Sequence, residues 1–348
     1  MRACGRGHLA LATGGVGLDG TWPLFERVAQ SPVAFWWLPE PAWFAVPLAL
    51  AGGFWLLLPR GVPGKPLALL LWLPLLWPQR GLPEPGVAEL VVVDVGQGLS
   101  VLVRTAGHTL LYDMGPGKPD GYDAGASVVV PALHALGVRR LDAAIVSHGD
   151  NDHAGGFASV VGAFPPRTVY TPAGMPRRDS PTSDCLAGTH WSWDGVTFRF
   201  LHPPRWFPYL DNEASCVMRI EAGGQVALLP GDIGQVIERR LVRNDAQALR
   251  ADVVLVAHHG SHNSSDPLFI AATRARHALV SAGYANRFGH PDPDVVTRWQ
   301  AAGAQVAGTY ATGAQRLWLG RGVVAVEAER ARRRRLWDAV AGFDAPRR

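Results

Sequence analysis

Cysteine, lysine and charge are scarce in parts of this sequence, and each scarcity limits what the chain can be. Three cysteines in 348 residues cannot form the disulfide framework of a small secreted domain. Cys185 and Cys216 can still pair with each other if they lie outside the cytoplasm. The only lysines are Lys65 and Lys118, so the net charge of +4 comes from arginine and gives thin support for a nucleic-acid partner. Residues 1–30 contain no continuous apolar run, and we therefore expect no secretory signal peptide.

Charge is almost absent from residues 28 to 83, where two uncharged apolar runs occur. Residues 41–59 form a run of 19, and residues 66–78 form a shorter run of 13. At ~1.5 Å per residue the longer run reaches across a ~30 Å hydrocarbon core, and tryptophans near the ends of both runs suit a membrane interface. We predict two transmembrane helices at 41–59 and 66–78. A pair of buried helices in a soluble protein is the alternative.

Residues 1–85 are therefore expected to form a membrane segment, the end of a longer membrane domain. The loop between the two apolar runs carries Arg60 and Lys65, and positively charged loops tend to face the cytoplasm. The chain that follows the second run would then emerge on the outer side of the membrane.

A cluster of proline and glycine at 83–86 marks the start of a second domain, expected at residues 86–328. Short apolar runs bounded by glycines predict strands, and runs with helical periodicity predict helices. The expected strands are residues 90–95, 99–104, 109–113, 141–147, 196–201, 216–221, 225–229, 252–257 and 278–281. The expected helices are residues 127–136, 233–242, 267–274 and 294–302. This order predicts an α/β fold with sheets sandwiched between helices.

Four side chains that can bind metal occur within six residues, directly after the predicted strand at 141–147. They are His148, Asp150, Asp152 and His153. A strand end holds the backbone rigidly while the loop turns these side chains toward one point, and glycines at 155 and 156 allow the next helix to start close by. The sequence therefore predicts a metal-binding loop; a solvated polar turn is the alternative.

The loop resembles the His-x-His-x-Asp-His signature of the metallo-β-lactamase superfamily, with Asp150 in place of the second histidine. Further runs extend the resemblance to the ComEC family, whose members internalise DNA in competent bacteria. These runs are Asp94-Val-Gly-Gln-Gly98, Leu111-Tyr-Asp-Met-Gly115, Asn212-Glu-Ala-Ser215, Gly231-Asp232, His258-His-Gly-Ser261 and Asn286-Arg-Phe-Gly-His-Pro291. The resemblance covers roughly residues 20–328. It implies a metallo-β-lactamase-like αββα sandwich preceded by a transmembrane helical segment.

The same resemblance implies two metal sites. His148 and Asp150 would bind one ion, Asp152 and His153 the other, and Asp232 would bridge them. Zinc members usually have a third histidine before that aspartate, but residues 212–215 contain none. Hard oxygen ligands favour Mn²⁺ or Mg²⁺ over Zn²⁺. Two such ions together can activate water and stabilise a phosphodiester transition state. We therefore expect two divalent ions, with Mn²⁺ favoured, and a nuclease rather than a zinc hydrolase.

Other residues are candidates for completing the site. His258, His259 and His290 each follow a predicted strand; any of them could be a further metal ligand, and a core histidine is the alternative. With Asp152, His258 and His259 are the predicted catalytic residues. Ser215 and Ser261 are candidates for contact with phosphate, and Asp94 and Gln97 for orienting ligands, although a structural turn at 94–98 is equally expected.

The predicted function is DNA uptake, with a nuclease domain that degrades one strand beside a membrane channel. The expected partners are DNA, the bacterial inner membrane, other DNA-uptake proteins and a second copy of the chain, with the hydrolase domain on the outer, periplasmic side. Residues 329–348 are rich in arginine and form either a solvated helix end or a site for phosphate or anionic lipid. Two alternatives stay open: a DNA-binding transport module with a vestigial metal site, and a metallo-hydrolase of another phosphoester.

Overall fold

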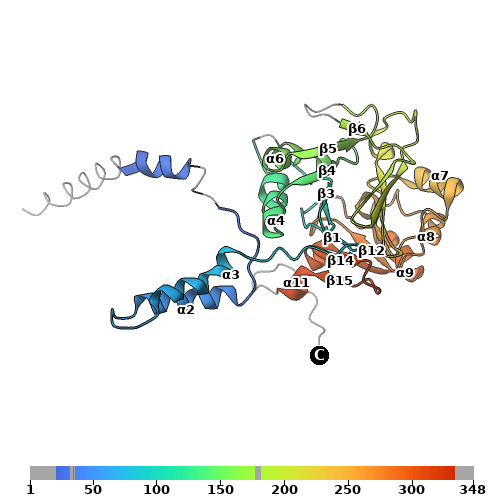
Figure 1. Cartoon of the computed structure of the whole chain (residues 1–348). Helices are drawn as coiled ribbons and strands as arrows, with labels where there is room; N and C mark the ends of the chain where they lie inside the picture. Colours follow the sequence, from blue (N-terminus) through green and yellow to red (C-terminus); the bar gives the residue numbers. More distant parts are fainter. Residues whose placement is uncertain (1–20, 32–33, 35, 119, 177–181, 334–348) are drawn as a thin grey trace, which may run out of the picture. The chain divides into compact units, whose positions relative to one another are not determined.

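The computed structural model describes residues 21–31, 34, 36–118, 120–176 and 182–333 (Figure 1). The chain divides into two compact units, Met1–Gln79 and Arg80–Arg348. Each unit is described below by itself.

In the first unit, the two predicted apolar runs form shorter helices than expected. Residues 41–59 contain α2 (Ala45–Leu57), and residues 66–78 fall on η1 (Lys65–Trp72) and α3 (Leu73–Leu76). At 13 residues α2 is shorter than the ~20 that a bilayer requires. Within the described part of the chain, no helix combines the length and apolar character needed to cross a membrane. The prediction of two transmembrane helices is therefore not supported by this structure.

The helices of this unit pack closely where α2 carries Gly52. A Cβ atom added there would lie 2.7 Å from the carbonyl oxygen of Ala68 on η1. The Lys65 ammonium group donates to the carbonyls of Leu56 and Leu58, at the end of α2. Because the last carbonyls of a helix have no partner within it, this contact stabilises the turn that follows α2.

The second unit contains two mixed β-sheets. The eight-stranded sheet has the order β15-β14-β1-β2-β3-β4-β5-β6, and the seven-stranded sheet has the order β13-β12-β11-β10-β9-β8-β7. The first sheet comprises β1 (Ala88–Val92), β2 (Val101–Arg104), β3 (Thr109–Tyr112), β4 (Leu141–Ile145), β5 (Pro166–Thr171), β6 (Thr182–Asp184), β14 (Gln315–Leu319) and β15 (Val326–Ala328). The second comprises β7 (His190–Trp193), β8 (Val196–His202), β9 (Val217–Ala222), β10 (Gln225–Leu229), β11 (Val253–Leu255), β12 (His277–Val280) and β13 (Gln305–Gly308).

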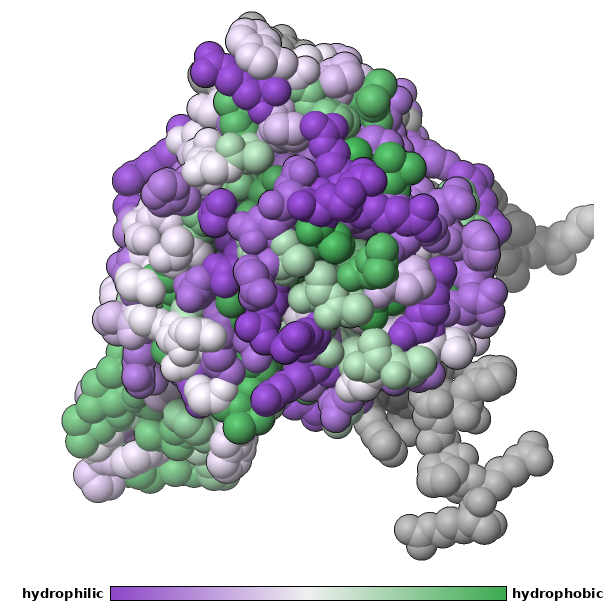
Figure 2. Space-filling model, turned by 90° about the vertical axis from the view of Figure 1, so that its right-hand side faces the viewer, coloured by the Kyte–Doolittle hydropathy of each residue, from purple (hydrophilic) through white to green (hydrophobic). Residues whose placement is uncertain are grey.

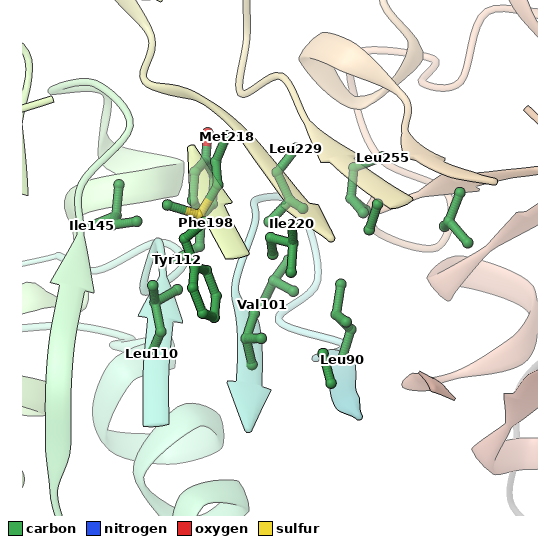
Figure 3. Packing of buried hydrophobic residues seen from close by; sticks show 14 of the residues in the cluster. Leu90, Val101, Leu110, Tyr112, Ile145, Phe198, Met218, Ile220, Leu229 and Leu255 are labelled. Atoms are coloured by element: carbon green, nitrogen blue, oxygen red, sulfur yellow. The ribbon is translucent and has the colours of Figure 1, made fainter. Parts of the chain in front are cut away.

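The main core lies between the two sheets (Figure 3). Leu90, Leu110 and Tyr112 of one sheet face Phe198 and Ile220 of the other. Neighbouring residues on the same strands, such as Val91 and Leu111, belong to a second cluster on the opposite face of the first sheet. Successive side chains of a strand point to opposite faces, so each of these strands contributes to two apolar layers.

Helices cover the outer faces of both sheets (Figure 1). On the first sheet these are η2 (Gly125–Val129), α4 (Val130–Ala135) and α6 (Phe157–Ala163). On the second they are α7 (Gln235–Asp245), α8 (Pro267–Thr273) and α9 (Pro293–Ala301). Figure 2 looks onto the side of α7 and α8, where hydrophilic side chains surround smaller hydrophobic areas. This layering is the αββα sandwich expected from the sequence.

Candidate metal centre

Polar residues from both sheets gather at one edge of the sandwich. Strand β3 runs parallel to β4, and β10, β11 and β12 run parallel to one another. The carboxyl ends of parallel strands meet at one edge of their sheet. Asp113 follows β3, the 147–153 loop follows β4, Asp232 follows β10, and His258 and His259 follow β11. The predicted loop and the distant candidates are thus brought together by topology.

The 147–153 loop turns directly from β4 into a short helix, α5 (Asn151–Ala154), which carries Asp152 and His153. The two glycines after α5 are required by close backbone packing, as predicted. A Cβ atom at Gly155 would collide with the backbone of Gly117, and one at Gly156 with the carbonyl oxygen of Met114.

Among the described residues, three groups of three side chains have the spacing of a metal site, with possible ligand atoms within 4.8 Å of one another. One group, His262, Asp292 and Asp294, is mostly exposed. The other two share His153; they are His148, His153 and Asp232, and Asp152, His153 and His259. His153 Nε2 lies 3.1 Å from Asp232 Oδ1, and His259 Nε2 lies 3.2 Å from Asp152 Oδ2. The structure thus gathers a buried cluster of histidines and carboxylates suited to a metal.

Hydrogen bonds fix the tautomers of two of these histidines. His153 Nδ1 lies 2.7 Å from Asp113 Oδ2, and His259 Nδ1 lies 2.8 Å from the carbonyl oxygen of Ser281. Neither oxygen can donate when the carboxyl is ionised, so each Nδ1 carries a proton. Each Nε2 can then bind a second proton or, when the ring is neutral, offer its lone pair to a metal. His148 Nε2 is also buried and has no hydrogen-bond partner among the described residues. Inward-facing nitrogen lone pairs beside carboxylates fit a divalent cation.

The pKa values of the residues in the cluster show that it favours positive charge. Burial lowers the pKa of His153, but the carboxylates of Asp232 and Asp113 raise it well above its usual value. Burial raises the pKa of Asp232, but His153 and His259 lower it well below the ordinary range. Burial also raises the pKa of Asp152, but the hydrogen bond with His259 and the charge of His153 outweigh this effect and lower the pKa to about 2. The cluster stabilises ionised carboxylates that attract a cation.

Asp113 was not among the site residues expected from the sequence, yet it anchors the loop. Its buried carboxylate accepts from the backbone N–H of Ser147 at 2.7 Å, from the Ser147 hydroxyl at 2.7 Å and from His153 Nδ1. Its φ of 58° is unusual outside glycine. The signal that could have found it is a lone carboxylate at the end of an apolar strand, before Gly115.

Three of the predicted ligands lie outside both three-residue groups. Asp150 has a half-exposed side chain whose Oδ2 lies 3.6 Å from His148 Nε2. His258 Nε2 lies 3.9 Å from Asp232 Oδ2 and 3.4 Å from Asn212 Nδ2. The ring centre of His290 lies 6.0 Å from that of His258 and 6.4 Å from that of His259. These residues form a rim around the buried ligand atoms.

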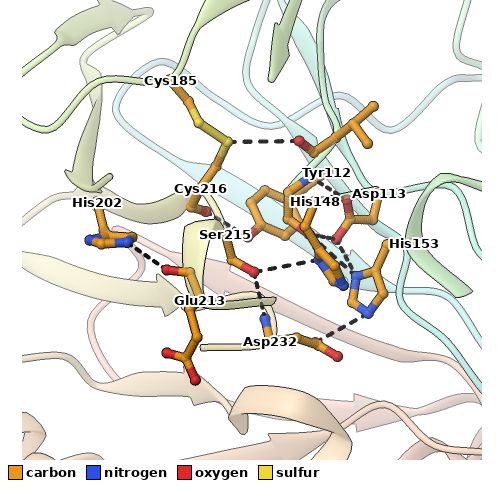
Figure 4. Close-up of a disulfide and its surroundings, with 12 residues drawn as sticks. Tyr112, Asp113, His148, His153, Cys185, His202, Glu213, Ser215, Cys216 and Asp232 are labelled. Atoms are coloured by element: carbon orange, nitrogen blue, oxygen red, sulfur yellow. Dashed lines mark hydrogen bonds and ion pairs between the residues drawn. A yellow bond between two sulfur atoms is a disulfide. The ribbon is translucent and has the colours of Figure 1, made fainter. Parts of the chain in front are cut away.

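The predicted supporting residues contact the site in different ways. Ser215 accepts from the backbone N–H of Asp232 at 3.1 Å, and its Oγ lies 3.4 Å from His148 Nδ1 (Figure 4). Gln97 accepts from the backbone N–H of Gly283. Gly283 lies two residues after Ser281, whose carbonyl oxygen is the hydrogen-bond partner of His259 Nδ1. Ser261 closes the turn after β11 through its backbone N–H, which donates to the carbonyl of His258.

Asp94 pairs with an arginine of the C-terminal segment. Its Oδ2 lies 3.1 Å from Arg330 Nη2 on α11 (Glu329–Arg332). Burial raises the pKa of Asp94, and Arg330 partly offsets that effect. Only the beginning of the predicted basic tail is described, and residues 334–348 lie outside the described residues.

Cys185 and Cys216 form a disulfide that ties the two sheets together beside the 147–153 loop (Figure 4). Cys185 follows β6 of the first sheet, and Cys216 precedes β9 of the second. The backbone N–H of Cys216 donates to the carbonyl of Ser147 at 3.0 Å. The pairing expected from the sequence is therefore present, and it holds Ser215 beside the loop.

The comparison with known protein families agrees with this geometry. Residues 93–284 match the metallo-β-lactamase superfamily. The chain belongs to this superfamily. The match includes the 147–153 loop, Asp232, His258 and His259, so the buried His/Asp cluster is a metal-site-like cluster on a metallo-β-lactamase hydrolase fold.

Three relatives of this metallo-β-lactamase domain carry names connected with competence or recombination. Competence protein ComA of Neisseria gonorrhoeae is 41% identical over 84% of this chain and 42% of its own length. Recombination protein 2 of Haemophilus influenzae is 32% identical over 66% of this chain and 28% of its own length. ComE operon protein 3 of Bacillus subtilis is 30% identical over 64% of this chain and 32% of its own length. The chain thus spans less than half the length of these relatives, and the domain is of the ComEC, ComA and Rec2 type, as predicted.

Proposed function

We propose that this domain is a metal-dependent nuclease that acts on DNA during its uptake across the bacterial inner membrane. The observation that carries the proposal is the inward-facing cluster of His148, His153, His259, Asp152 and Asp232, which combines buried nitrogen lone pairs with ionised carboxylates. The names of the ComA and recombination relatives support a DNA-uptake setting.

In this proposal His148, His153 and Asp232 would hold one divalent ion, and Asp152 and His259 would hold a second. Asp150 would reach the first ion from the rim. The carboxylate share of this ligand set, and the absence of a histidine from residues 212–215, favour Mn²⁺ over Zn²⁺. When bound, the ions supply Lewis acidity that activates water and neutralises charge on a phosphodiester.

The chain's own residues would divide the remaining tasks. Asp113 and the carbonyl of Ser281 orient the two histidines, which fixes where the ions can bind. His258 is partly exposed at the rim, with a side chain 28% accessible, and is placed to give a proton to a leaving oxygen. Its φ of 53° and the φ of 55° at His259 are strained for non-glycine residues, as is common where a site dictates the backbone.

The placement outside the cytoplasm is also a proposal. A structural disulfide persists in the periplasm and is rare in the reducing cytoplasm, so the Cys185–Cys216 pair supports a domain on the outer side.

A nuclease assay tests the function. The protein is stripped of metal, reloaded separately with Mn²⁺, Mg²⁺ or Zn²⁺, and incubated with end-labelled single- and double-stranded DNA. We expect cleavage that is fastest with Mn²⁺ and is abolished by Asp152→Ala. The exposed carboxylate of Asp245 at the end of α7 provides the matched control, and Asp245→Ala should cut like the wild type. DNA binding without cleavage under every metal would instead support a transport module with a vestigial site, and cleavage of a simple phosphoester alone would indicate another hydrolase.

A further inference from the structure

Three aromatic rings lead outward from the metal centre to the surface. The ring of His259 is nearly parallel to that of His290, with an interplanar angle of 21° and centres 6.4 Å apart. His290 in turn is nearly parallel to Phe288, at 24° and 5.7 Å. The series ends at Phe288, whose side chain is 53% exposed. A ligand that covers Phe288 would therefore contact the outer end of a series of rings that begins at His259 in the cluster.

The segment between β12 and α9 holds this exposed ring in a fixed place. The side chain of Asn286 accepts from the backbone N–H of Phe288 at 3.1 Å and of His290 at 3.0 Å. It also donates to the carbonyls of Gly283 and His290, at 2.9 and 2.6 Å. One amide thus ties both ends of the 283–290 turn together. The ordered turn therefore presents a large aromatic ring to solvent at a fixed position.

The surroundings of the ring have the chemistry of a nucleotide site. The Arg287 guanidinium lies 4.8 Å from the centre of the Phe288 ring, and Tyr284 on the same turn is 50% exposed. Residues of the turn, among them Asn286 and His290, line a cavity of about 570 Å³. His290 Nδ1 is buried and has no hydrogen-bond partner among the described residues.

We propose that the 283–290 turn is a stacking platform for one base of a single DNA strand whose backbone lies at the metal centre. Aromatic rings with nearby arginines bind single strands because every base offers a face for stacking, whereas the bases of a duplex are already stacked on one another. The base takes the place that the Arg287 guanidinium occupies over the Phe288 ring, and Arg287 pairs with a neighbouring phosphate. This inference rests on the proposed nuclease function and adds the substrate class, single-stranded DNA.

Binding of a single strand without cleavage tests the platform separately from the chemistry. The probe is a thymidine 12-mer with one 2-aminopurine, titrated with the full chain in EDTA; stacking quenches its fluorescence. Phe288→Ala should weaken binding roughly 5- to 150-fold and remove the quench. Phe288→Leu keeps apolar bulk but has no aromatic face, so it should bind as weakly as Phe288→Ala. Phe288→Trp should retain binding, which would show that the turn folds with a substitution at this position.

The matched control is Trp318, another aromatic ring with arginine near its face: it lies on β14, and the guanidinium groups of Arg316 and Arg321 lie near its ring. Trp318→Ala should leave the affinity for the 12-mer unchanged. A 12-mer of abasic sites should bind the wild type and Phe288→Ala equally weakly.

The outcomes separate the two proposals. Loss of affinity in Phe288→Ala together with no cleavage under any metal would overturn the nuclease and keep the platform. Two results would overturn the platform and keep the nuclease, provided that the wild type cleaves DNA. One is equal affinity of the wild type for normal and abasic strands, and the other is equal affinity of Phe288→Ala and the wild type for the normal strand. A wild type that binds no single strand overturns the platform as well.

Discussion

His153 and His259 direct their Nε2 atoms at each other across 3.1 Å. Their Nδ1 atoms are held from behind by Asp113 and by the carbonyl of Ser281, so neither ring can turn its protonated nitrogen inward without losing a buried hydrogen bond. Although burial lowers the pKa of both rings, the carboxylate of Asp232 raises it above the usual value, so a positive charge is favoured between the two Nε2 atoms. A bound cation takes the place of a proton there and also satisfies the carboxylates of Asp152 and Asp232, which lie within 3.5 Å of these nitrogens.

Replacing the carboxylate behind His153 should weaken metal binding. In Asp113→Asn the amide offers a single acceptor for the three donors that Asp113 now satisfies, and its NH₂ group favours the opposite tautomer of His153. We expect Mn²⁺ affinity to fall about 10- to 100-fold, as is typical when a ligand histidine loses its orienting partner. Isothermal titration of Mn²⁺ into the metal-free protein measures this.

Asp142 provides the control for that substitution. Its carboxylate is also buried and also accepts from a backbone N–H, that of Thr109, but it pairs with arginines rather than with a site histidine. Asp142→Asn should lower stability without changing Mn²⁺ affinity. Equal affinities in Asp113→Asn and wild type would show that Asp113 does not orient a ligand.

Removing metal should lower the thermal stability of the domain. Binding to the folded state alone contributes about 2.7 kcal/mol at a hundredfold excess over the dissociation constant. The melting temperature in EDTA should therefore rise when Mn²⁺ is added, and the rise should disappear in Asp232→Asn. Differential scanning calorimetry gives both values; a melting temperature that ignores Mn²⁺ in the wild type would contradict a metal held by this cluster.

Much of the fold follows from periodicity in the sequence, but the edges of the sheets do not. The strands that the sequence indicated between 90 and 229 are strongly apolar, and their structural counterparts differ only at their ends. By contrast, β5 (Pro166–Thr171) and β7 (His190–Trp193) are only partly buried, so their polar residues hide the apolar signal. Strand β14 (Gln315–Leu319) pairs with β1 from more than 200 residues away, and no local pattern specifies that partner.

The site was predictable where its residues are adjacent in sequence. The 148–153 loop stands out because four ligand types follow a strand, whereas Asp113 is one carboxylate among many and depends on the pairing of β3 with β4 for its role. The family resemblance implies pairing His148 with Asp150 and Asp152 with His153. The structure places Asp152 and His153 in one group of possible ligands with His259. It also groups His148 with His153 and Asp232, because α5 turns His153 inward and leaves Asp150 at the rim. The apolar run at 41–59 predicts one helix that spans the membrane, but the helix in the structure is the shorter α2, which lies between Pro41 and Pro59.

Breaking the disulfide should destabilise the domain. Cys185 and Cys216 close a loop with a sequence separation of 31, and a cross-link of this kind typically contributes about 2–4 kcal/mol to the free energy of unfolding. In a Cys4→Ser background, the Cys185→Ser, Cys216→Ser double variant should have a free energy of unfolding, measured with urea, that is lower than its parent's by that amount. Thiol labelling of the parent, purified from cells without reductant, should detect no free thiol until it is unfolded and reduced. Labelling of both cysteines in the untreated protein would also count against placement outside the cytoplasm.

A buried histidine away from the metal ligands should make stability fall in acid. Burial lowers the pKa of His202 from 6.5 to about 4, although its Nε2 lies 2.9 Å from the carbonyl of Glu213. The unfolded chain therefore binds a proton at higher pH than the folded chain does, and the stability that depends on neutral His202 is present above pH 6.5 and is lost as the pH falls toward 4. At 1.36 kcal/mol per pKa unit this loss is about 3 kcal/mol. His202→Gln keeps a donor for Glu213 but cannot titrate, so its free energy of unfolding, measured by urea in EDTA, should fall less between pH 6.5 and 4 than that of the wild type. The exposed His190 on β7 is the control, since His190→Gln should follow the wild-type curve; parallel curves for His202→Gln and wild type would contradict the assignment.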